Sequence, residues 1–141
     1  MTRKGNPRQL FADLVADCVG YRKLEQLLDD QFAAALRIDT LALGTLAQSI
    51  AGEVDTLDLH RRYRVEQLGN VPGAVQALGA KVFAGERHAE QRKAVAERCA
   101  EMNTLAARCQ ARASRNGALL AGQYEAMQRV LHGERHTYVP A

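Results

Sequence analysis

The last third of the chain, residues 86–138, carries an apolar repeat that strongly favours one long helix. Apolar or small residues recur there mostly at gaps of three or four, with one full heptad. This spacing marks one face of a helix over many turns. The repeat continues through Asn116-Gly117, a dipeptide that normally stops a helix. The residues on this face are Met102, Cys109, Ala113, Gly117, Leu120, Tyr124, Met127 and Leu131.

Two shorter periodic segments precede this repeat. The first has apolar residues at a mean spacing of about 3.5, the value of coiled-coil-like packing. It predicts a helix over about residues 7–37, with Asn6 as N-cap and Pro7 in the first turn. The second predicts a helix over about residues 40–68, with Asp39 as N-cap. Because the connection between them is short, these helices should form an antiparallel hairpin.

The clearest break in the chain is Gly69-Asn70-Val71-Pro72-Gly73. We expect residues 69–85 to form a linker that contains either a short helix or an ordered loop. The third helix should cover about residues 86–132, and Gly133 should end it before a flexible tail over residues 133–141. The prediction is an all-α fold and a single domain over residues 1–141. An elongated antiparallel helical hairpin and the long third helix would form a coiled-coil-like three-helix bundle.

Charge and cysteine content exclude several classes of protein. The 19 basic and 16 acidic residues are interspersed, whereas a nucleic-acid-binding domain gathers basic charge on one face. We therefore expect no nucleic-acid binding. The three cysteines lack a CxxC pair, which is typical of reduced, buried thiols in a cytoplasmic protein. No apolar stretch approaches the ~18 residues of a membrane span, so we expect no membrane insertion.

Motifs that carry catalysis or bind metals are missing from the sequence. There is no glycine-rich phosphate loop, no HExxH and no Glu-x-x-His pair of a di-iron bundle. His60 has no acidic residue at helical spacing on its C-terminal side, and we interpret it as a surface or boundary histidine. We therefore expect no enzyme activity, no cofactor and no metal site.

The unequal helix lengths indicate a surface for a partner. A third helix of about 45 residues would be about 70 Å long, against about 45 Å for each of the other two. Part of its apolar face would stay uncovered, and exposed apolar area of this kind marks partner sites. Helix-in-groove recognition is the expected mode. A homodimer would cover the same face, so the alternative is a self-associating coiled-coil protein without a chaperone role.

The run Asn116-Gly117-Ala118-Leu119-Leu120-Ala121-Gly122-Gln123 resembles the Asn-Gly-x-Leu-Leu-x-x-Gln signature of FlgN-type flagellar export chaperones. The helical layout is similar over almost the whole chain. The resemblance implies a cytosolic chaperone of the flagellar type III export system. Its clients would be the C-terminal helical segments of the hook–filament junction proteins FlgK and FlgL. The chaperone would prevent their premature assembly and deliver them to the export gate protein FlhA.

The resemblance also implies roles for individual residues. Tyr138 matches a tyrosine that family members use at the export gate. Here it is followed by Val139-Pro140-Ala141 instead of the Gly-x-x-Gly of relatives, so the glycine-dependent turn is missing. Client binding falls on the long helix. The residues implied for it are Met102, Leu105, Cys109, Ala113, Gly117, Leu120, Tyr124, Met127 and Leu131.

Overall fold

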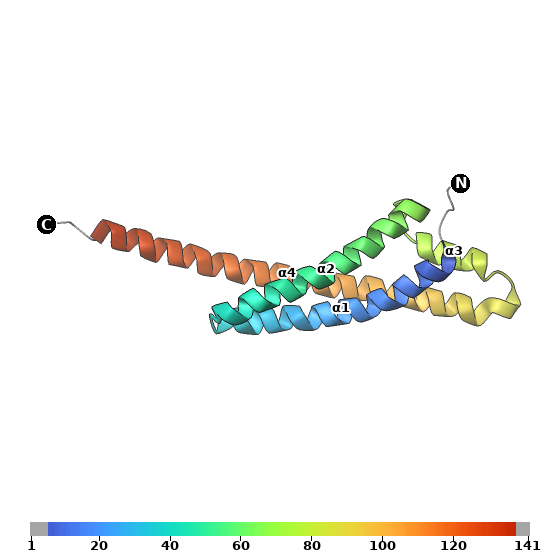
Figure 1. Ribbon diagram of the computed structural model, residues 1–141, viewed down its shortest axis with the longest axis horizontal. Helices are drawn as coiled ribbons and strands as arrows, with labels where there is room; N and C mark the ends of the chain where they lie inside the picture. The colour runs from blue at the N-terminus through green and yellow to red at the C-terminus, as the bar shows by residue number, and fades with distance from the viewer. Residues whose placement is uncertain (1–5, 138–141) are drawn as a thin grey trace.

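The computed structural model describes residues 6–137, with side chains described as far as Gly133, and consists of helices and their connections. No strand occurs in this part of the chain, which confirms the predicted all-α fold. Figure 1 shows an elongated molecule in which the longest helix extends well beyond the others. In chain order the elements are α1 (Pro7–Leu36), α2 (Thr40–Leu68), α3 (Ala74–Val82), the 3₁₀ turn η1 (Glu86–His88) and α4 (Ala89–Thr137).

The first two helices begin at the side-chain caps expected from sequence. The Asn6 side chain accepts a hydrogen bond from the backbone N–H of Gln9, and Pro7 occupies the first turn. The Asp39 side chain accepts from the N–H of Ala42 at 3.1 Å. Each cap satisfies a backbone donor that has no partner inside its helix. These short polar side chains therefore set where α1 and α2 start.

The turn between α1 and α2 needs one residue in the left-handed region. Ile38 has a φ of 55°. This conformation lets the N–H of Ile38 donate to the carbonyl of Ala35, and the N–H of Asp39 donate to that of Ala34. The last carbonyls of α1 are thus satisfied as the chain reverses. The result is the tight antiparallel hairpin that the short connection predicted.

The central helix of the molecule is α1, which packs against both α2 and α4. Within residues 6–137, no α-carbon of α2 lies within 8 Å of one of α4. Two apolar clusters hold the assembly together. One joins α1, α3 and α4 around Leu14, Val75, Val95 and Cys99. The other joins α1, α2 and α4 around Leu24, Leu28, Leu57 and Cys109.

The linker after α2 contains the short helix α3, which packs closely on α4. A Cβ on Gly79 would lie 2.8 Å from Cγ1 of Val95, a separation that side chains do not tolerate. Gly79 therefore lets α3 approach the start of α4. Gly73, with a φ of 75°, precedes the first residue of α3, and Gly85, with a φ of 90°, precedes the 3₁₀ turn η1.

The long helix α4 differs from its predicted form at the C-terminal end. We expected Gly133 to end it, but α4 continues through Gly133 to Thr137. That expectation was wrong because Gly133 stays helical and adopts no positive φ, in contrast to Gly69, Gly73 and Gly85. A glycine lowers helix propensity by only about 1 kcal/mol. Residues 133–137 of the predicted tail therefore belong to α4, and Tyr138–Ala141 lie outside the described residues.

Candidate functional site

The nine residues implied for partner binding do not all lie on one surface. Leu105 and Cys109 are each only 4% exposed. Cys109 packs with Leu28 and Leu57, and its thiol donates to the carbonyl of Tyr21. These two residues therefore belong to the core of the free chain, where a partner has no access to them. Met102 is half-buried against the other apolar cluster.

The remaining residues form a strip along α4 that is open to solvent. Ala113 and Gly117 are exposed, and a Cβ on Gly117 would meet nothing within 4 Å. Leu120 is half-buried. Beyond it the helix projects past the turn of the hairpin, as Figure 1 shows. The large apolar residues on this projecting end are strongly exposed: Tyr124 (60%), Met127 (50%), Val130 (64%) and Leu131 (51%).

Two polar side chains mark the place where α4 leaves α1. The amide of Asn116 is 1% exposed, and its nitrogen donates to the carbonyl of Leu28 at 2.7 Å and to Gln31 Oε1 at 2.8 Å. The amide of Gln123 donates to the carbonyl of Ala35 at 2.8 Å. Both belong to the Asn-Gly-x-Leu-Leu-x-x-Gln run. These two side chains therefore attach α4 to the C-terminal part of α1. The sequence alone did not predict this role.

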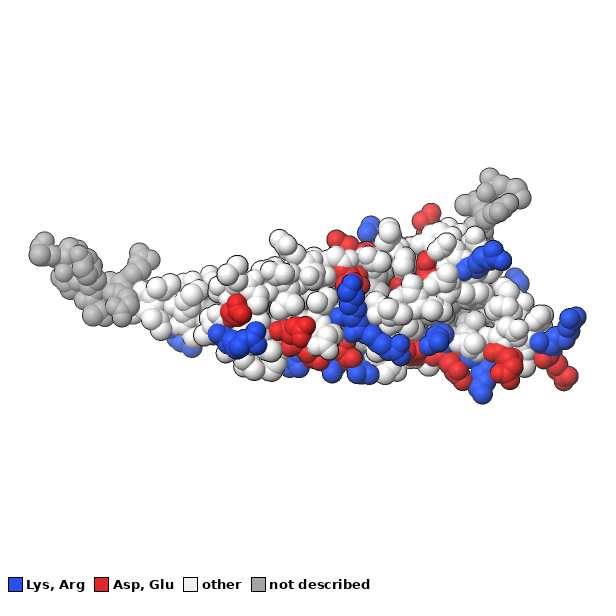
Figure 2. Space-filling model, turned by 60° about the horizontal axis from the view of Figure 1, so that its bottom comes forward, with Lys and Arg blue, Asp and Glu red and all other residues white. Residues whose placement is uncertain are grey.

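The contact between α1 and α4 also includes ion pairs. Glu25 pairs with Arg108 at 2.7 Å and with Arg112 at 2.9 Å. Asp29 pairs with Arg112 at 3.0 Å and with Arg115 at 3.2 Å. Each of these three arginines therefore has an acidic partner on α1, although the three share two carboxylates. On the face that Figure 2 shows, basic and acidic side chains are intermixed and no extended patch of one sign is present.

The contact between α1 and α2 includes a buried polar cluster that sequence reasoning missed. Asp17 is 1% exposed. One oxygen lies 2.6 Å from Nδ1 of His60, and the other accepts from Nη1 of Arg64 at 2.5 Å. His60 is thus a partner of an acid on another helix, which no spacing within α2 reveals. Leu57 is the one fully buried residue of α2, and Ile50 and Leu68 are partly buried against the apolar clusters, so this polar cluster adds a second kind of contact between α1 and α2.

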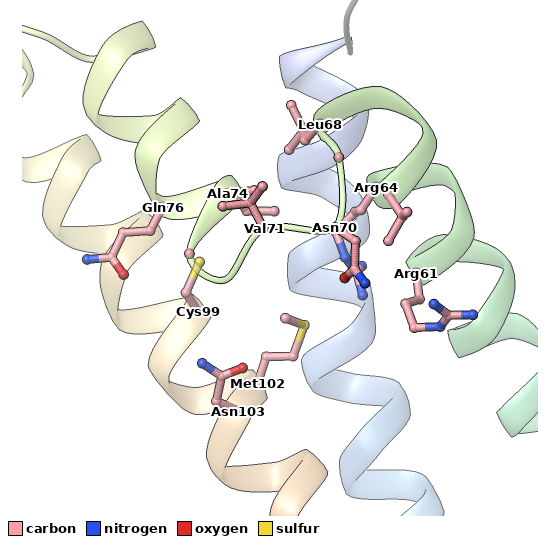
Figure 3. Close-up of a pocket in the computed structure, with 14 residues that line it drawn as sticks. Arg61, Arg64, Leu68, Asn70, Val71, Ala74, Gln76, Cys99, Met102 and Asn103 are labelled. Atoms are coloured by element: carbon pink, nitrogen blue, oxygen red, sulfur yellow. The ribbon is translucent and has the colours of Figure 1, made fainter.

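A cavity of about 150 Å³ opens between α2 and α4, beneath the loop that leads into α3. Figure 3 shows Met102 and Asn103 of α4 on one side, Arg61 and Arg64 of α2 on the other, and the loop across one end. Both α2 and α4 pack against α1, and no α-carbons of α2 and α4 lie within 8 Å of each other in the described residues, which leaves room for the cavity between them. Its apolar lining comes from Val65, Leu68, Val71, Val75, Cys99 and Met102.

All three cysteines are free and buried. Burial raises the pKa of Cys18, Cys99 and Cys109 above the ordinary value of 9.0, because a thiolate is poorly solvated there. The thiol, which is the less reactive form, therefore persists at neutral pH. These residues fill the core and are poor nucleophiles.

Among the described residues, no group of three or more His, Cys, Asp or Glu side chains is placed to hold a metal ion. Over the same residues, no helix is long and apolar enough to cross a membrane. Tyr138, the residue implied for gate docking, lies outside the described part of the chain.

Comparison with known proteins gave one result. A family model described as "FlgN protein" matches residues 1–133 of the chain. No curated protein and no solved structure matches it.

Proposed function

The chain belongs to the FlgN family, a family of flagellar export chaperones and not of enzymes, and we propose that it is a cytosolic chaperone for the hook–filament junction proteins FlgK and FlgL. It binds the C-terminal helical segments of these clients and prevents their premature assembly. It then delivers them to the cytoplasmic domain of the export gate protein FlhA. The family match over residues 1–133 is the observation that carries this proposal.

The open strip on α4 supports the client-binding part of the proposal. Its projecting end exposes Tyr124, Met127, Val130 and Leu131 within two turns of helix. An amphipathic client helix laid on this strip would bury these side chains and its own apolar face together. Of the implied set, Met102, Ala113, Gly117, Leu120, Tyr124, Met127 and Leu131 remain accessible or partly accessible, and they form the proposed client-binding surface.

Such binding requires no nucleotide. Burial of apolar surface contributes about 25 cal/mol per Å², from which the ordering costs of association are subtracted. The exposed glycine and alanine on the strip allow the backbone of a client to approach closely. Release then depends on competition or pulling at the export machinery.

We assign gate docking to Tyr138 by its match to the tyrosine of the family. The residue follows directly after the end of α4 at Thr137. A docking residue at this end of the chain would let client and gate be held at the same time. Replacing Tyr138 with Ala should weaken binding to FlhA and leave client binding unchanged.

Capture of purified client segments by the full-length chain tests the client-binding part directly. Met127→Asp puts a charge on the exposed apolar strip, and Gln128→Asp makes the same change in charge at a neighbouring exposed polar position. We expect Met127→Asp to weaken capture of FlgK and FlgL segments by about tenfold or more, because an unpaired carboxylate would have to be buried. Gln128→Asp should bind as the unaltered chain does. Equal capture by both variants would contradict the assigned surface.

Self-association is the competing explanation of the same exposed strip. Sedimentation velocity over a hundredfold range of concentration separates the two. The chaperone proposal expects one sedimentation coefficient that does not change with concentration until client is added. If the mass of the chain doubles as its concentration rises, and if Met127→Asp stays monomeric under the same conditions, the chain is a coiled-coil protein that pairs with itself.

A further inference from the structure

The cavity between α2 and α4 is built from an apolar floor and a polar, positively charged rim. Val75, Cys99 and Met102 contribute to the floor. At the rim are Arg61 of α2 and Asn103 of α4, both exposed. A cavity of about 150 Å³ is the size that accepts a molecule such as benzene. One leucine, methionine or phenylalanine side chain therefore fits it.

The charges at the cavity are of one sign. Its lining contains Arg61 and Arg64 and no aspartate or glutamate. Arg64 is committed to the buried Asp17. Arg61 is 58% exposed and shares the single carboxylate of Asp58 with Arg62. Arg61, Arg62 and Asp58 together therefore carry a net positive charge, which would favour a carboxylate on whatever occupies the cavity.

The cavity lies on the same helix as the open strip of α4, and the buried Leu105 and Cys109 lie between the two. Met102 lines the cavity, and Ala113, Gly117, Tyr124 and Met127 follow on the same helix face at helical spacing. At 1.5 Å per residue, Met102 and Met127 are about 37 Å apart along α4. A client helix of about 25 residues would reach from the cavity to the projecting end. The exposed Ala113 and Gly117 would lie beneath its middle, where close approach is needed.

We propose that this cavity is the anchor site for the client helix. It takes one large apolar side chain of the client, and Arg61 pairs with an aspartate or glutamate of the client within one turn of that side chain. This inference rests on the proposed function and goes further, because it selects among clients by a short pattern of an apolar residue beside an acid. The strip supplies contact area, and the cavity sets the register.

Methionine methyl groups provide a direct test, because the three methionines of the chain are Met1, Met102 and Met127. With ¹³C-methyl methionine, Met102 reports on the cavity and Met127 on the projecting end. The probe is the C-terminal helical segment of FlgK, titrated into the full-length chain. We expect the Met102 and Met127 signals to shift together with one binding curve.

Arg61→Glu and Arg62→Glu form a matched pair for the charge at the rim. Both arginines are exposed and pair with Asp58, but the lining of the cavity includes Arg61 and not Arg62. We expect Arg61→Glu to weaken segment binding by about fivefold or more and Arg62→Glu to change it less than twofold. Replacing the acid of the client segment with lysine should restore binding to Arg61→Glu.

The outcomes separate the two proposals. If Met127 shifts on titration and Met102 does not, the client binds the strip and the cavity proposal is overturned. If Arg61→Glu and Arg62→Glu bind the client segment equally well, the proposed pairing of Arg61 with an acid of the client is overturned. If no signal shifts and no segment binds, both the proposed function and the anchor site are wrong. A Met102 signal that moves with protein concentration alone would instead identify a second copy of the chain as the occupant.

Discussion

The side-chain amide of Asn116 on α4 donates a 2.7 Å hydrogen bond to the backbone carbonyl of Leu28 on α1. Asn116 is fully buried at this contact, next to the exposed Gly117. The hydrogen-bonding groups of a buried amide must find partners inside the protein, so this bond fixes the position of α4 along the axis of α1. Asn116, part of an Asn-Gly dipeptide that normally ends a helix, here fixes the register between α4 and α1.

Replacing Asn116 with Ala should lower the free energy of unfolding by roughly 1–3 kcal/mol, because two hydrogen bonds across the α1–α4 contact are lost in a buried place. Urea unfolding followed by circular dichroism measures this change. Asn103→Ala is the control, since Asn103 is an exposed asparagine of the same helix. It should stay within about 0.5 kcal/mol of the unaltered chain. Equal effects at both positions would show that the buried amide has no special role.

Two glycines should respond to alanine in opposite directions. Gly79→Ala should destabilise the chain by about 1–3 kcal/mol, because its Cβ would lie 2.8 Å from Val95 and force α3 away from α4. Gly117→Ala should stabilise it by about 0.5–1 kcal/mol, because its Cβ meets nothing and alanine favours the helix. Thermal unfolding of both variants should show a lowered melting temperature for Gly79→Ala and a raised one for Gly117→Ala. A destabilised Gly117→Ala variant would mean that this part of α4 is covered in solution.

Asp17→Asn should destabilise the chain by about 3 kcal/mol, because it removes the charge that compensates the largely buried Arg64. The loss should be concentrated in α2, so amide hydrogen exchange there should quicken more than in α4. Asp58→Asn removes an acid from an exposed pair on α2 and should cost less than about 1 kcal/mol. Uniform exchange across all helices would contradict a local role for Asp17.

The buried cysteines predict a loss of stability in alkali. Their pKa values are raised in the folded chain, so below pH 9 the thiols are protonated in both folded and unfolded states. As the pH rises above 9, the unfolded chain loses these protons first, and folding becomes less favourable. Urea unfolding from pH 7.5 to 10.5 should show a plateau followed by a fall. In addition, iodoacetamide should label the native chain at pH 8 far more slowly than the urea-unfolded chain. Equal labelling rates would contradict the burial of the thiols.

Features that depend on neighbours along the chain could be predicted. Asn6 and Asp39 cap the helices that follow them, and Pro72 and Gly73 lie in the break after α2, as the spacing of residues indicated. Each of these depends on groups within a few residues of each other. Gly133 was misjudged because a single glycine costs a long helix little, and only a left-handed backbone there would have ended it.

Features that join distant segments could not be predicted. Neither His60 nor Asp17 has its partner nearby in sequence, since the two are 43 residues apart. The cavity was missed for the same reason, because its lining comes from both α2 and α4. The family resemblance pointed to the run around Asn116, but it did not separate the buried residues from the exposed ones.

The sequence by itself determined that this protein is a set of amphipathic helices, where the first two begin, and which long helix carries surplus apolar surface. Periodicity and capping depend on residues within a single helix, so both can be predicted from short stretches of sequence. Only the tertiary structure decided the rotation of α4 about its axis, which buries Asn116 and exposes Gly117 although the two are adjacent. That choice is made by the carbonyls of α1 and by the apolar clusters, because neighbouring residues point about 100° apart and packing selects which of them faces inward.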